Sequence, residues 1–216
     1  MSILTLSGSP SAPSRSGHLL THLRGVLEAA GERTSHLALR ELPPAALLAA
    51  RVDDPEIAAA TRAVAEAQVV ILATPVYKAA YSGLLKTFLD LLPQTGLRDK
   101  VVLPIATGGS LAHTLAIDYA LRPVLSALGA RHILPGIFAV DQQIAYSETQ
   151  GLSLDPALDA RLAEGVLRLR EALAHARIAV PLDLLPGTAA GADTSTAPAA
   201  FSRAAARPAA AGRCSA

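Results

Sequence analysis

Residues 3–23, with the sequence ILTLSGSPSAPSRSGHLLTHL, contain the pattern that decides the fold. The segment opens on the apolar residues Ile3, Leu4 and Leu6, which are typical of a strand buried on both faces. Glycine, serine and proline then form a loop, and from Ser16 onward leucines recur at the spacing of one helix face. A helix N-terminus carries unpaired N–H groups and a partial positive charge, so the segment indicates an anion site.

The residues of this loop favour a compact phosphate monoester that is bound without a metal. Ser9, Ser14 and Ser16 offer hydroxyl donors, and Arg15 offers a cation. The sequence lacks the G-x-x-x-x-G-K-Ser/Thr loop of nucleoside triphosphate sites and the G-x-G-x-x-G loop of dinucleotide folds. The simpler interpretation, in which Ser14 and Ser16 only cap the helix, stays open on this loop alone.

The composition excludes several classes of protein. The chain has 216 residues, 51% of them hydrophobic, which is enough for one well-packed domain. Its net charge of +1 and its few aromatic residues argue against nucleic-acid binding. There is no apolar run long enough to span a bilayer and no signal-peptide layout, so we expect no membrane partner and a cytoplasmic location. The single cysteine, Cys214, excludes an intrachain disulfide.

Apolar segments that predict strands alternate with segments that predict helices. The strands are expected at residues 3–7, 34–39, 69–73, 101–106 and 132–140, and the helices at 16–27, 45–50, 56–67, 81–92, 111–128 and 155–177. This pattern predicts an α/β fold with a doubly wound five-stranded parallel sheet in the order 2-1-3-4-5 and helices on both faces. The domain is expected to span 1–186, and the Ala/Pro/Gly-rich residues 187–216 are expected to be a disordered tail.

Two further loops are expected beside the first one. In a doubly wound sheet, ligands bind beyond the carboxyl ends of the strands, at the switch point next to the first and third strands. The loop after the third strand is stiffened by a proline, and the loop after the fourth has glycines that let the backbone approach a ligand. Three such loops at one edge favour a mononucleotide over a bare phosphate. The candidate residues of these two loops are Thr74, Pro75, Val76, Tyr77, Thr107, Gly108 and Gly109.

No catalytic acid–base pair and no metal site is indicated. The six histidines are scattered, and none has metal-ligand spacing beside carboxylates. This suits hydride chemistry that a cofactor carries out. Within the segment 111–128, Pro123 cannot donate to the carbonyl of Tyr119, so we expect a kink or a π-bulge there, or a helix that ends earlier.

The segments GSPSAPSRS, ATPVYKAAYSGLLKTFLDLLP and KVVLPIATGGSLAHTLAIDYALRPVLSALGA resemble the NADPH-dependent FMN reductases of the alkanesulfonate-utilisation system. The resemblance runs from residue 3 to about residue 140, and more weakly to residue 177. It implies a flavodoxin-like enzyme that reduces FMN with NADPH, or with NADH, and supplies a partner monooxygenase that cleaves sulfonates. The stretch around Tyr119 resembles a helix insertion at tetramer contacts, which implies a homo-oligomer, either a dimer or a tetramer.

The resemblance also implies a role for each candidate residue. Ser9, Ser14, Arg15 and Ser16 would hold the FMN phosphate. The isoalloxazine would be lined by Pro75, Val76 and Tyr77, and its polar edge would lie near Thr107, Gly108 and Gly109. Ser11 and Ala12 stand where this family often carries a basic or an aromatic residue.

Two other functions remain open on the sequence. An FMN-retaining quinone or azo-dye reductase has the same fold and would keep its flavin through turnover. A flavodoxin-type electron carrier is expected to be acidic so that it can dock redox partners, and the net charge of +1 argues against it. A purely structural protein would not need three loops suited to ligand binding at one edge of the sheet.

Overall fold

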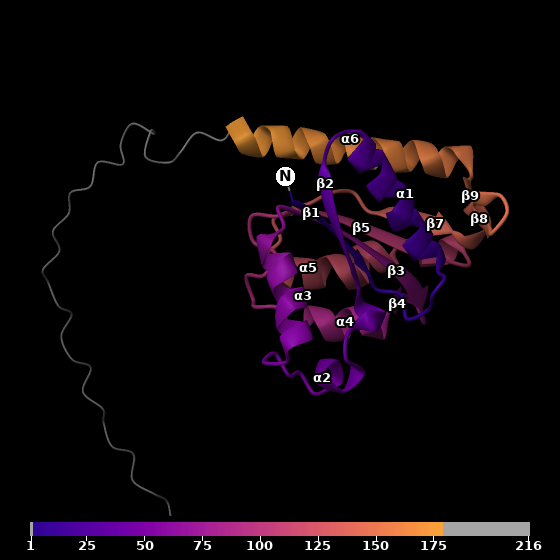
Figure 1. The fold of residues 1–216 in the computed structure, drawn as a ribbon. Helices are drawn as coiled ribbons and strands as arrows, with labels where there is room; N and C mark the ends of the chain where they lie inside the picture. Colours follow the sequence, from indigo (N-terminus) through magenta and orange to yellow (C-terminus); the bar gives the residue numbers. More distant parts are fainter. Residues whose placement is uncertain (1, 179–216) are drawn as a thin grey trace, which may run out of the picture. The chain divides into compact units, whose positions relative to one another are not determined.

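The computed structural model describes residues 2–178, in which helices cover both faces of a parallel sheet (Figure 1). The central path of the sheet has the order β2-β1-β3-β5-β6, and every pairing along it is parallel. Counted as the five predicted strands, this is the order 2-1-3-4-5, so the predicted topology is confirmed. The strands of the path are β1 (Ser2–Ser7), β2 (Arg33–Ala38), β3 (Val69–Tyr77), β5 (Val101–Gly108) and β6 (His132–Ile133).

The three central strands are apolar because both of their faces are covered. Every residue of β5 is buried, and so are residues 3–7 of β1 and 69–74 of β3. Alternate residues belong to different cores, since successive side chains of a strand point to opposite faces. Ile3 and Ile71 pack in one core, whereas Leu4 and Leu72 pack in the other.

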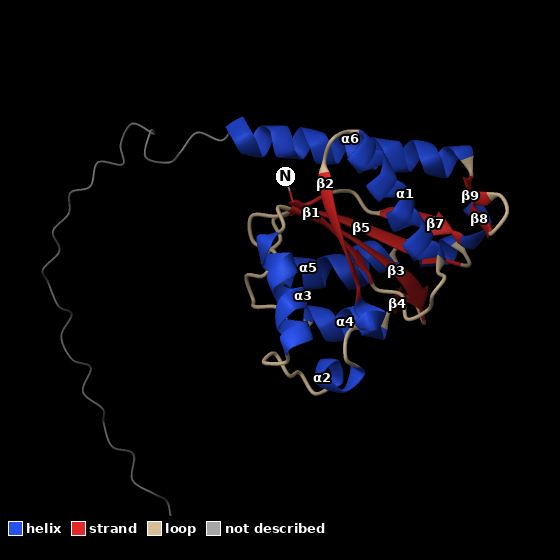
Figure 2. Ribbon diagram, viewed as in Figure 1, coloured by secondary structure: helices blue, strands red, loops and turns tan. Residues whose placement is uncertain are grey.

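Each face of the sheet has its own layer of helices (Figure 2). The core around Ile3 and Ile71 is closed by α1 (Arg15–Ala29) and α6 (Pro156–Ile178). The core around Leu4 and Leu72 is closed by α3 (Pro55–Glu66), α4 (Gly83–Leu89) and α5 (Arg122–Ala127), with the short α2 (Pro44–Leu48) beyond them. Buried leucine and isoleucine side chains thus hold both layers to the sheet.

The helix starts follow the capping residues of the sequence. Ser14 caps α1, so this helix begins one residue before the predicted start at Ser16. The Oδ1 atom of Asp155 accepts from the N–H groups of Ala157 at 3.0 Å and Leu158 at 3.3 Å, and Pro156 occupies the first turn of α6. Asp155 therefore caps α6 at the start of the helix predicted for 155–177.

Two predicted helices differ from the observed ones. The segment 111–128 is a 3₁₀ turn (η2, Leu111–His113), a π-helix (η3, Ile117–Leu121) and the short α5. The long helix was wrong, but the π-bulge expected beside Pro123 is confirmed. The helix expected from Tyr81 begins at Gly83, because Ala80–Tyr81 forms the short strand β4, antiparallel to β3.

The last predicted strand, 132–140, is broken in two. Pro135 and Gly136 separate β6 from β7 (Ile137–Val140), which pairs in parallel with β5. A Cβ atom at Gly136 would lie 2.5 Å from Cγ2 of Ile117, so the glycine allows η3 to pack against this break. Three elements were not predicted at all: two 3₁₀ turns, η1 (Leu39–Glu41) and η4 (Asp141–Gln143), and the antiparallel hairpin of β8 (Ile144–Ser147) and β9 (Gly151–Leu154).

None of the helices within residues 2–178 is both long enough and apolar enough to cross a membrane. The predicted tail, 187–216, and the predicted end of the domain at residue 186 lie outside the described residues.

Candidate functional site

A cavity of about 290 Å³ opens at the carboxyl edge of the sheet, where the loops after β1, β3 and β5 meet. All of the predicted site residues except Thr74 line it, so the sequence correctly predicted which loops come together. The sequence analysis did not select three of the lining residues, Ser11, Pro13 and Asp141. The full lining is Ser9, Ser11, Pro13, Ser14, Arg15, Ser16, Pro75, Val76, Tyr77, Thr107, Gly108, Gly109 and Asp141.

The first loop presents hydrogen-bond donors at the start of α1. The Oγ atom of Ser14 accepts from the N–H of Gly17 at 3.1 Å, and its own proton stays available. Ser16 is 1% exposed, and within residues 2–178 its hydroxyl has no hydrogen-bond partner. A buried hydroxyl without a partner is uncommon in a folded protein. Ser14 therefore caps the helix and Ser16 does not, and the Ser16 hydroxyl, in a residue that lines the cavity, remains without a partner.

The one cationic side chain of the cavity lining, Arg15, lies next to a carboxylate. Its NH1 atom is 3.5 Å from Oδ2 of Asp141, with 54% of the arginine side chain and 32% of the aspartate side chain exposed. Asp141 follows β7, whose last residue, Val140, pairs with Gly108 of β5. Asp141 therefore leaves the sheet at the same edge as the three predicted loops. The sequence signal was its position after the fifth apolar segment.

The second and third loops form two walls from neighbouring strands. Pro75 of β3 is in register with Thr107 of β5, and Tyr77 is 48% exposed at the cavity. Gly108 allows the close packing, since a Cβ atom there would lie 3.1 Å from Cζ of Phe138 and 3.6 Å from Cβ of Val76. These walls combine an aromatic ring, apolar side chains and exposed backbone.

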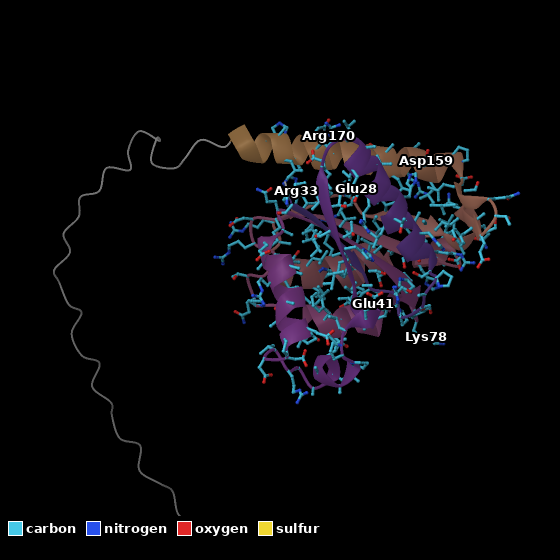
Figure 3. The ribbon with its side chains drawn as sticks, viewed as in Figure 1. Glu28, Arg33, Glu41, Lys78, Asp159 and Arg170 are labelled. Atoms are coloured by element: carbon cyan, nitrogen blue, oxygen red, sulfur yellow. The ribbon has the colours of Figure 1, made fainter. Side chains whose placement is uncertain are left out.

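The turn between β3 and β4 has an unusual backbone. Lys78 and Ala79 both have positive φ, at 51° and 65°, which residues other than glycine seldom adopt. The side chain of Lys78 extends away from the ribbon beside β4 (Figure 3). It is exposed and does not line the cavity. This turn sends the chain directly from Tyr77 back into β4.

Thr74 lies next to the cavity and not in its lining. Its side chain is fully buried, and its Oγ1 atom accepts from the N–H of Ser82 at 3.0 Å. Ser82 in turn donates from Oγ to the carbonyl of Gly8 at 2.5 Å and caps α4 by accepting from the N–H of Leu85 at 3.1 Å. Thr74 and Ser82 thus join the second loop to the first, and Thr74 positions the cavity without lining it.

Two histidines, His18 and His22, lie on α1 after the first loop. The ring of His18 stacks on Tyr146 of β8, with centroids 3.9 Å apart, and burial lowers the pKa of His18. The Nε2 atom of His22 lies 3.3 Å from Oδ1 of Asp159 on α6. These contacts hold β8 and the start of α6 against α1. Across residues 2–178 no group of three or more His, Cys, Asp or Glu side chains is arranged to hold a metal.

A larger cavity, of about 460 Å³, lies between α3 and the segment that follows α4. Apart from Thr61 and Arg62 its walls are apolar or glycine, and it contains none of the predicted site residues. Because it lacks a convergent set of polar groups, we assign the site to the cavity at the carboxyl edge.

The comparison with protein families shows the family of the chain. The model of the NADPH-dependent FMN reductase family matches residues 1–145, which contain all of the cavity lining. The chain belongs to the NADPH-dependent FMN reductase family. As a member of this family it is an oxidoreductase that acts with FMN and with NADPH or NADH.

Individual relatives agree with this family. An FMN reductase (NADPH) of Pseudomonas putida is 49% identical over 176 residues, which cover 81% of this chain and 89% of that protein. An FMN reductase (NADPH) of Escherichia coli is 48% identical over 185 residues, which cover 86% and 96%. Among solved structures, the apo form of an NADH:FMN oxidoreductase (EMOB) superposes with a TM-score of 0.72 at 38% identity, covering 79% of this chain and 89% of that one.

The hydrogen bonds of Ser82 should stabilise this FMN reductase. Ser82→Ala leaves the carbonyl of Gly8 and the N–H of Leu85 buried without this partner. We expect the free energy of unfolding to fall by about 1–3 kcal/mol. The melting temperature should fall by about 2–4 °C for each kcal/mol. Urea and thermal unfolding measure both quantities.

The matched control is Ser147→Ala, which removes an exposed bond from the N–H of Gln150 at 3.0 Å. This variant should lose less than about 0.5 kcal/mol. Equal losses for the two variants would contradict the bridging role of Ser82.

Proposed function

We propose that this chain is a flavin-diffusing reductase. In this proposal it binds FMN in the cavity at the carboxyl edge, reduces it at N5 with NADPH, and releases it to a partner monooxygenase of the alkanesulfonate type. The observation that carries the proposal is the buried, unpartnered hydroxyl of Ser16 beside Arg15 at the start of α1. An anion at this position would receive both a hydrogen bond and a charge.

The residues of the first loop fit a phosphate monoester. Helix geometry leaves the N–H groups of Arg15 and Ser16 without partners inside α1. These two residues line one cavity together with Ser9 and Ser14, so the loop brings hydroxyl, N–H and guanidinium donors to the same place. Most of these donors are neutral, so they can direct a phosphate without surrounding it by positive charge.

The second and third loops fit a planar ring. Pro75, Val76 and Tyr77 would line one side of the isoalloxazine, and Thr107, Gly108 and Gly109 would lie at its polar edge. Bound FMN supplies the redox chemistry, because its N5 accepts a hydride from the nicotinamide C4 of NADPH. The chain binds and orients the reactants, and none of its side chains has to transfer a proton. We therefore assign no catalytic residue.

Release of the flavin to a partner agrees with the open site. Arg15 and Tyr77 are about half-exposed, so a ligand held by them would remain in contact with solvent. Relatives in pseudomonads are named NADH-dependent FMN reductases SfnF and SfnE, at 36% and 32% identity. The alkanesulfonate substrate of the partner rests on the family resemblance, and we propose a cytoplasmic location, where NADPH and FMN occur.

The test of the proposed function is NADPH oxidation by flavin-stripped protein during a titration with free FMN. We expect saturable, FMN-dependent turnover, with reduced flavin that passes an ultrafilter under anaerobic conditions. Flavin that stays with the protein and turns over only with added quinone or azo dye would identify an FMN-retaining reductase instead. Tight FMN binding without NADPH oxidation would identify a flavodoxin-type electron carrier.

The phosphate assignment predicts that Arg15→Ala separates two flavins. The dissociation constant of FMN should rise about tenfold or more, because a charged hydrogen bond is lost. The affinity for riboflavin, which has no phosphate, should stay the same. Flavin fluorescence titrations measure both constants.

Arg168→Ala is the matched control for Arg15→Ala, since Arg168 pairs with Glu164 on the exposed side of α6. This control should change neither constant. Equal losses for FMN and riboflavin in Arg15→Ala would refute the phosphate position.

We also propose a homo-oligomer whose contact includes the π-helix. Leu111, Leu115 and Tyr119 are large apolar side chains with 69%, 59% and 78% exposure on consecutive turns. Burial of such a patch favours association with a second copy.

Tyr119→Ala should shift the protein to a smaller species in sedimentation velocity. Leu48 is also 78% exposed but lies on α2, so Leu48→Ala should leave the mass of the oligomer unchanged. The same mass for the unaltered protein and both variants would exclude the contact.

A further inference from the structure

The carboxylate of Asp141 stands beside the guanidinium that the proposed function assigns to the flavin phosphate. Asp141 lines the cavity, and its Oδ2 atom is 3.5 Å from NH1 of Arg15. Asp141 also lies next to the third loop, because a Cβ atom added at Gly109 would be 3.9 Å from the same Oδ2 atom. The carboxylate thus faces the region where two predicted ligand loops meet.

The backbone of the turn η4 keeps Asp141 in this place. Gln143 accepts at Oε1 from the N–H of Val140 at 3.2 Å and from NH2 of Arg161 at 3.1 Å. The NH1 atom of Arg161 donates to the carbonyl of Phe138 at 2.7 Å. The turn that carries Asp141 is therefore attached both to β7 and to α6.

The charges of the cavity are balanced before a ligand enters. Of the residues that line it, only Arg15 and Asp141 carry a formal charge, and they are opposite. A phosphate monoester carries a charge of about −1.5 to −2 at pH 7. A phosphate that binds Arg15 must displace the carboxylate from the guanidinium, and it then lies close to a like charge.

We propose that Asp141 is a specificity-determining residue that competes with the flavin phosphate for Arg15 and so keeps FMN binding weak and reversible. The inference rests on the proposed function, and in particular on the position of the phosphate. Because riboflavin has no phosphate, Asp141 does not oppose its binding. Asp141 thereby reduces the advantage of FMN over riboflavin and lets the phosphorylated flavin leave.

The experiment is a fluorescence titration of FMN and riboflavin with flavin-stripped Asp141→Asn protein. The substitution keeps the size of the side chain and removes its charge. The dissociation constant of FMN should fall about five- to tenfold, whereas that of riboflavin should change by less than about twofold. Asp141→Ser, which also removes the charge, should give the same pattern and provides a second measurement if the first variant does not fold.

Asp90→Asn is the matched control. Asp90 pairs with Lys86 at 2.5 Å on α4, outside the cavity, so the same chemical change should affect neither flavin. The double variant Arg15→Ala/Asp141→Asn should bind FMN no more than about twofold tighter than Arg15→Ala alone, because the competition no longer has a target. If Asp141→Asn tightened FMN binding five- to tenfold even without Arg15, the proposed competition for Arg15 would be overturned.

Two further outcomes would overturn the proposal. Unchanged or weaker FMN binding by both Asp141 variants would show that the carboxylate does not oppose the phosphate. Equal tightening for FMN and riboflavin would place its effect on the ribityl chain or the ring. Failure of the proposed function is distinguishable from these outcomes, since Arg15→Ala would then lower the affinities for FMN and riboflavin equally.

Discussion

The burial of the three central strands on both faces is the constraint on which the rest of this structure depends. Every residue of β5 is buried, and helices of both layers cover β1 and β3. A polar ligand has no access to the sheet along these strands, because unpaired polar groups there would lose their hydration. The chain can bind one only where the strands end, and in a parallel sheet the ends of neighbouring strands lie together. The loops after β1, β3, β5 and β7 meet for this reason.

Convergence alone would leave the loops free to move, and a buried hydrogen-bond bridge holds the first two together. Thr74 binds Ser82, and Ser82 binds the carbonyl of Gly8. Gly8 itself has to be glycine, since a Cβ atom there would lie 2.9 Å from Cβ of Leu85. The first loop is therefore packed against the start of α4 before any ligand arrives. Such preorganisation lowers the entropy that is lost on binding.

The sequence predicted the strands, their order and most of the cavity lining, because those features follow from local apolar patterns and from the rules of parallel sheets. It did not predict the features that depend on distant contacts. The inward side chain of Thr74 depends on Ser82, and the break at Pro135 and Gly136 depends on packing against Ile117. The position of Asp141 follows from the register of β7 with β5, and its place after the fifth apolar segment was its one local signal. The predicted helix began at Tyr81, two residues too early. Ala80 and Tyr81 pair with β3 instead, after a turn in which Lys78 and Ala79 adopt positive φ.

In the proposed function, the balance of charge in the cavity would favour exchange of the ligand over its retention. Hydroxyl and backbone N–H donors orient a phosphate by geometry, and each gives a modest net gain, because the same groups would otherwise bind water. The long-range attraction must come from Arg15, which is half-exposed and already paired with Asp141. The walls for a planar ring are made of Val76, Tyr77 and glycine, and the ring of Tyr77 is itself half-exposed. In the proposed function, both ends of the site would therefore hold the flavin without burying it deeply, which would favour its release.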